Sequence, residues 1–110
     1  MAAIDLGKLL PNMLNAAKGV LQKRWPEAKD YAESEFKKMG ESLLFIEKQR
    51  AAGQMTEEQA RLHMDIQKNT SRTVLLTLEG LGILAVEEAI NAALAVIRDA
   101  VNSALGFALL

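Results

Sequence analysis

Apolar residues recur at helical spacing along most of the chain. Leu6, Leu10, Met13, Ala17 and Val20 are separated by steps of 4, 3, 4 and 3 residues, which places them on one face of a helix. The same steps recur between Ala32 and Ile46. No run alternates between apolar and polar residues with the two-residue period of a half-buried strand. The pattern therefore predicts an all-α fold.

Proline and glycine mark the ends of the first two predicted helices. Trp25 precedes Pro26, and a residue before proline avoids the α conformation, so the first helix should end there. Pro26 suits the first position of the next helix, and Gly53 suits the position just after its end. Pro11 either kinks the first helix or begins it. The two predicted helices cover residues 5–24 and 26–52.

The third predicted helix has the clearest start in the chain. Thr56 followed by Gln59 forms a capping-box sequence, and no proline occurs from there to Leu110. An unbroken helix over residues 57–110 would span about 80 Å, far more than the roughly 34 Å diameter of a compact domain of this length. Weak helix formers at 69–71 and the glycines at 80 and 82 favour a break or bend between residues 69 and 82.

The last third of the chain is unusually apolar. Of the 37 residues from 74 to 110, 25 are apolar, and residues 69–110 carry only 6 charges. A strict 3-4 spacing runs from Thr73 to Ala108, as in the seam of a helical bundle or coiled coil. Two amphipathic helices cover only one side of such a helix. We therefore expect a helical bundle completed by oligomerisation through this helix.

One charged residue, Glu87, lies on this apolar seam, where a carboxylate needs a partner. Arg72 and Arg98 are the nearest basic residues along the chain. Arg98 can reach Glu87 if two copies pair antiparallel across a two-fold axis, and the crossing point then falls between Ala92 and Ala93. The predicted oligomer interface comprises Ile83, Glu87, Ile90, Ala92, Ala93, Leu94, Ile97, Arg98 and Val101.

Composition narrows the range of partners. The formal net charge is −1, and there is no cysteine, so neither nucleic acid nor anionic lipid is attracted by overall charge, and thiol chemistry is excluded. A membrane span is not favoured, because any window long enough to cross a bilayer includes two charges from Glu87, Glu88, Arg98 and Asp99. No targeting segment is recognisable in the first residues, which predicts a cytoplasmic protein.

The sequence presents no catalytic, cofactor-binding or metal-binding motif. His63 is the one histidine, and no nucleophile or carboxylate is placed to work with it. Glu79 and Glu87 lack the Glu-x-x-His pairing of di-metal bundles. We therefore expect a non-enzymatic structural or assembly protein that self-associates. The alternatives are a metal or small-ligand carrier with its site inside an oligomeric bundle, and a peripheral protein on a lipid or hydrophobic granule surface.

Overall fold

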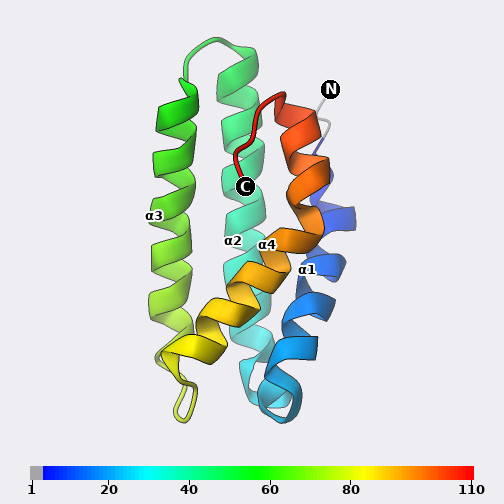
Figure 1. Cartoon of the computed structure of the whole chain (residues 1–110), viewed down its shortest axis with the longest axis vertical. Helices are drawn as coiled ribbons and strands as arrows, with labels where there is room; N and C mark the ends of the chain where they lie inside the picture. The colour runs from blue at the N-terminus through cyan, green and yellow to red at the C-terminus, as the bar shows by residue number, and fades with distance from the viewer. Residues whose placement is uncertain (1–3) are drawn as a thin grey trace.

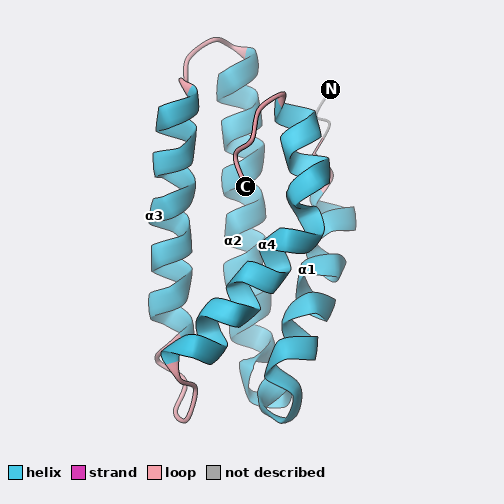
Figure 2. Ribbon diagram, viewed as in Figure 1, coloured by secondary structure: helices cyan, strands magenta, loops and turns pink. Residues whose placement is uncertain are grey.

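A computed structural model of the chain describes residues 4–110 and shows an elongated helical bundle measuring 43 × 23 × 18 Å. No β-strand occurs in these residues (Figure 2). Three helices run roughly along the long axis, and the last helix crosses them obliquely (Figure 1). The elements are α1 (Leu6–Leu21), a 3-10 turn η1 (Gln22–Arg24), α2 (Trp25–Ala51), α3 (Glu57–Leu75) and α4 (Ile83–Leu105). The all-α prediction is confirmed.

Helix α1 begins ahead of its proline. The Asp5 carboxylate accepts a hydrogen bond from the Gly7 N–H at 3.0 Å and caps the helix, while Pro11 lies inside it. The alternative in which Pro11 begins the helix is therefore wrong. Pro11 is exposed, so the backbone carbonyl that loses its amide partner at this turn can be satisfied by water.

The hairpin between α2 and α3 follows the predicted capping signals. Gly53 adopts φ 71°, and its N–H bonds the Arg50 carbonyl while Gln54 bonds the Gln49 carbonyl. This is a Schellman motif. At the start of α3, Gln59 N–H donates to Thr56 Oγ1 at 3.1 Å, and Thr56 N–H donates to Gln59 Oε1 at 2.9 Å. The predicted capping box is confirmed.

The predicted break falls at the second of the two weak points. Residues 69–71 remain helical, while residues 76–82 form the loop between α3 and α4. Thr70 and Thr73 each donate a hydroxyl hydrogen bond to the carbonyl four residues earlier, at 3.0 Å. In the loop, Gly80 has φ 85°. The Arg24 guanidinium donates to the Glu79 carbonyl and pairs with Glu27 at 2.7 Å, which fastens this loop to the start of α2.

The apolar face of α4 is covered within one chain. Its most extensive contact is with α1, which lies beside it in Figure 1. The first helices therefore cover more of α4 than the sequence argument allowed. The buried residues of α4 are Val86, Ala89, Ile90, Ala93, Leu94, Ile97 and Val101, and those of α1 are Leu9, Met13, Ala17 and Leu21.

Candidate functional site

The structure divides the predicted interface residues between core and surface. Ile83, Glu87, Ala92 and Arg98 reach solvent to some degree, and Ile83 is 53% exposed. An interface on this face of α4 stays a prediction. Among the predicted interface residues, Ile83 is the one that would supply most of the exposed apolar surface for such an interface. The predicted interface residues that lie in the core of a single chain are Ile90, Ala93, Leu94, Ile97 and Val101.

Glu87 has a partner in its own chain. Its Oε1 lies 3.4 Å from Nε of Arg72, and the two side chains are 41% and 32% exposed. Arg98 instead lies near Asp99, at 3.9 Å. The predicted antiparallel pairing of two α4 helices depends on Glu87 needing a cation from another copy. The ion pair with Arg72 supplies that cation, so the structure removes the reason for pairing Glu87 with Arg98.

A second apolar seam is exposed on α3. Its residues are separated by steps of 4, 3, 4 and 3, the spacing with which helices pack against each other. Leu62 is 61% and Ile66 is 58% exposed, and neither packs into the core. We call this set the α3 seam, and all five of its residues are exposed: Leu62, Ile66, Asn69, Thr73 and Leu76.

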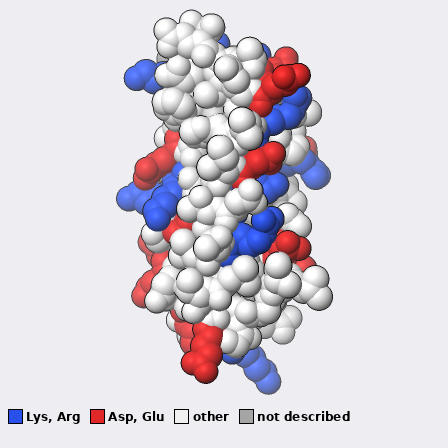
Figure 3. Space-filling view, turned by 90° about the vertical axis from the view of Figure 1, so that its left-hand side faces the viewer, with Lys and Arg blue, Asp and Glu red and all other residues white. Residues whose placement is uncertain are grey.

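The surroundings of the α3 seam are uncharged over much of its length. Figure 3 views the face of the molecule that carries α3 and shows an uncharged band along the long axis, with acidic and basic groups on both sides. Phe45 of α2 extends the apolar surface, since its ring stacks on His63 of α3 with centroids 5.2 Å apart and is 46% exposed. The single histidine thus contacts an aromatic ring and faces no nucleophile.

A groove lies between the middle of α3 and α4. Its volume is about 370 Å³, and the last two residues of the chain also line it. Met64 and Lys68 come from α3, and Leu94 and Arg98 come from α4. The groove combines nearly buried apolar side chains with basic groups at its edges, which is the composition of a ligand site for an amphipathic molecule.

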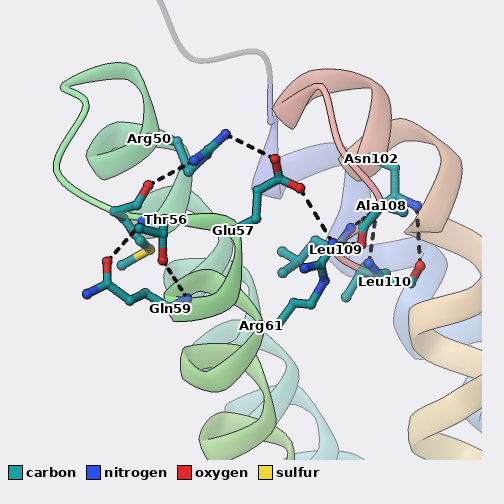
Figure 4. Close-up of polar contacts among 10 residues, drawn as sticks. Arg50, Thr56, Glu57, Gln59, Arg61, Asn102, Ala108, Leu109 and Leu110 are labelled. Carbon is teal, nitrogen blue, oxygen red and sulfur yellow. Dashed lines mark hydrogen bonds and ion pairs between the residues drawn. The ribbon is translucent and has the colours of Figure 1, made fainter.

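Residues 106–110 turn back at the end of α4, run alongside the helices (Figure 1) and are held by Asn102 (Figure 4). The Asn102 carboxamide oxygen accepts from the N–H groups of Leu109 and Leu110 at 2.9 and 3.0 Å, and its NH₂ group donates to the Leu110 carbonyl at 3.3 Å. The Phe107 ring lies 4.9 Å from the Arg50 guanidinium and 5.5 Å from that of Arg61. We call this arrangement the Asn102 clasp.

Glu35 is the one acidic side chain buried in the described part of the chain, at 2% exposed. Its Oε2 accepts from Lys38 Nζ at 3.1 Å, while Oε1 has no hydrogen-bond partner among residues 4–110. A buried carboxylate with one exposed cation as its partner is costly. Sequence analysis did not single out Glu35, because a glutamate next to a phenylalanine on an amphipathic helix is ordinarily solvated.

No group of three or more His, Asp or Glu side chains within residues 4–110 is arranged to hold a metal ion. Among the same residues, no helix combines the length and the apolarity that crossing a bilayer requires. Comparison of the chain with protein-family models, with curated proteins and with solved structures found no match.

Proposed function

We propose that this chain is a non-enzymatic assembly module that self-associates through the α3 seam. The observation that supports this proposal is the seam itself, a line of exposed, uncharged residues at helix-packing spacing on a helix otherwise anchored mainly to α2. Three large apolar side chains on that line, Leu62, Ile66 and Leu76, lie in water in the single chain. Covering them with a second helix removes this apolar surface from water.

Charge complementarity favours a second copy in antiparallel orientation. With a two-fold axis between Ile66 and Asn69, Ile66 faces the partner's Asn69 and Leu62 faces the partner's Thr73, while Leu76 lies at the level of the partner's Gln59. Asp65 then lies about 3 Å along the axis from the level of the partner's Arg72. Asp65 is exposed and has no ion-pair partner in the described chain. In a parallel pair, a residue beside the seam contacts the partner residue five positions later. Asp65 would then meet the partner's Thr70, which is uncharged, and no ion pair would form.

Asn69 supports a defined register. A single polar residue in an apolar seam lowers the stability of helix pairing but disfavours shifted alignments. Asn69 already accepts from the Arg72 guanidinium at 2.7 Å, so its side chain is held in one orientation beside the proposed interface. The seam is therefore suited to a weak association in one register. Copies of a module associate in this way when they build a larger assembly.

A lipid or hydrophobic granule surface is the competing occupant of the α3 seam. Leu62, Ile66 and Phe45 would insert into such a surface. The outer face of α3 offers this surface little electrostatic attraction, because acidic and basic groups both flank the band (Figure 3). The second copy is therefore the occupant that we propose, and the vesicle surface becomes an outcome of the test.

Cysteine cross-linking tests both the interface and its orientation, because the chain contains no cysteine of its own. The double variant Leu62→Cys/Thr73→Cys should oxidise to a covalent dimer at a concentration where the control Leu62→Cys/Val96→Cys stays monomeric. Val96 is exposed on α4 and lies off the seam. Efficient cross-linking of Leu62→Cys alone would indicate a parallel pair.

Two further outcomes would overturn the proposal. The first is equal cross-linking of the seam variant and the control, which would indicate random collision. The second is cosedimentation of the unmodified chain with phospholipid vesicles that is lost in Ile66→Asp, in the absence of any cross-linked dimer.

A further inference from the structure

The groove between α3 and α4 carries two cations that self-association does not use. Its floor is formed by Met64 and Leu94, which are 2% and 7% exposed and line the cavity with the little surface they retain. Leu109, held by the Asn102 clasp, also lines the groove. An alkyl chain entering the groove would therefore contact apolar side chains from α3, from α4 and from the tail.

Two cations from opposite walls line the same groove. Lys68 of α3 forms no hydrogen bond or ion pair within residues 4–110. Arg98 of α4 has one ionic neighbour, Asp99, at 3.9 Å, and Asp99 is fully exposed. Such an exposed contact contributes little. Both cations are therefore available to a ligand.

The acidic groups at the groove set a limit on the charge of the ligand. Asp65 and the carboxyl group of Leu110 also line the cavity, so the two cations face two acidic groups. A ligand with one negative charge can lie between the two cations, whereas a multiply charged phosphate would approach the acidic groups without further cations to compensate it. A carboxylate also accepts two parallel N–H bonds from an arginine.

The volume of the groove selects a single chain. Pockets for small ligands range from roughly 300 to 1,000 Å³, and this one, at about 370 Å³, lies near the lower limit. We propose that the groove binds a free fatty-acid-like molecule, one carboxylate on one alkyl chain. The carboxylate lies between Lys68 and Arg98, and the chain lies along Met64, Leu94 and Leu109.

The two cations of the groove are independent of self-association, although Asp65 of the lining is also the residue placed near the partner's Arg72. Lys68 and Arg98 lie off the α3 seam, which runs along the solvent side of α3, whereas the groove lies on the side that faces α4. Each site can therefore fail without the other. Binding should be measured on the full chain at a concentration where sedimentation shows one species.

The test is a titration of the isotopically labelled full chain with dodecanoate, followed through backbone amide chemical shifts. Dodecanoate should produce saturable shifts at residues 64–68, 94–98 and 109. Lys68→Gln and Arg98→Gln should each weaken binding about tenfold. Lys18→Gln, at an exposed lysine of α1, should leave binding unchanged.

A second pair of variants tests the cavity without altering charge. Ala95 lines the groove from the exposed side of α4, so Ala95→Phe should fill the cavity and abolish the shifts. Val96→Phe, on the next residue but outside the lining, should not. If Ala95→Phe fails to fold, the two charge variants still decide the matter.

Several results would overturn the proposal. Equal binding of dodecyltrimethylammonium would indicate apolar partitioning without recognition of the carboxylate. Shifts centred on Leu62 and Ile66 would place the ligand on the α3 seam. Binding to phosphatidylglycerol vesicles without binding of free dodecanoate would show that the chain binds a membrane surface and not a free fatty acid. The absence of saturable shifts would show that the groove does not bind dodecanoate.

Discussion

The Asn102 clasp makes a quantitative prediction about stability. Asn102→Ala removes the acceptor of the Leu109 and Leu110 N–H groups and the donor to the Leu110 carbonyl. A hydrogen bond of this kind contributes about 0.5–1.5 kcal/mol. The three bonds are only partly buried, and water can replace some of them, so we expect a loss of about 1.5–3 kcal/mol in the free energy of unfolding.

Asn91→Ala is the matched control. Asn91 lies on the same helix, is exposed, and makes no hydrogen bond in the described chain. The same substitution there changes only helix propensity, by at most about 0.7 kcal/mol in the stabilising direction. The difference between the two variants therefore isolates the clasp from the intrinsic preference of alanine for a helix.

Urea denaturation should be combined with amide hydrogen exchange. The Leu110 amide should be protected in the unmodified protein and in Asn91→Ala, and should exchange freely in Asn102→Ala. The Leu109 N–H also donates to the Phe107 carbonyl at 3.1 Å, so its protection should fall less. Equal unfolding midpoints for the two variants would refute the reasoning. So would unchanged protection at Leu110, because that amide has Asn102 as its acceptor.

Three further substitutions test other contacts by denaturant unfolding. Thr56→Ala should lower stability by about 0.5–2 kcal/mol through loss of the capping box, and no loss would contradict it. Gly80→Ala should cost about 1–2 kcal/mol, because φ is 85° and a Cβ would meet the Arg24 guanidinium; Gly82→Ala, with open space around it, should cost much less. A double-mutant cycle on Arg72 and Glu87 should give a coupling of about 0–1 kcal/mol in a single chain, and a coupling that grows with protein concentration would show that the pair joins two chains.

Local signals allowed much of the fold to be predicted. The capping box at Thr56, the glycine at 53 and the proline at 26 each act within a few residues of their own position, so the sequence contains the whole interaction. The break before α4 was confined to residues 69–82 for the same reason. The first weak point stays helical, and Thr70 and Thr73 there turn their hydroxyl groups to carbonyls one turn earlier.

The candidate surfaces could not be predicted because two seams share one spacing. Thr73 and Leu76 fit the series that continues into α4, and they also fit the series that begins at Leu62. Periodicity does not say which series another helix covers. The structure shows that the α4 residues face α1, while the α3 seam is left exposed.

The clasp and the partner of Glu87 depend on contacts that periodicity does not describe. Asn102 was an unremarked polar residue in an apolar helix, and its role depends on the tail turning back at Gly106, where φ is 79°. Arg72 reaches Glu87 because the loop at residues 76–82 reverses the chain. Each contact joins residues on opposite sides of a turn. The residues of the turn do not reveal in which direction the chain continues, so neither contact could be predicted.

Sedimentation equilibrium of the unmodified chain over a wide range of concentration tests self-association most directly. Self-association through the α3 seam predicts a mass that rises from 12.0 kDa towards twice that value, a rise that Ile66→Asp abolishes and Val96→Asp leaves intact. A mass that stays at that of one chain at every concentration would contradict it, as would equal loss of association in both variants.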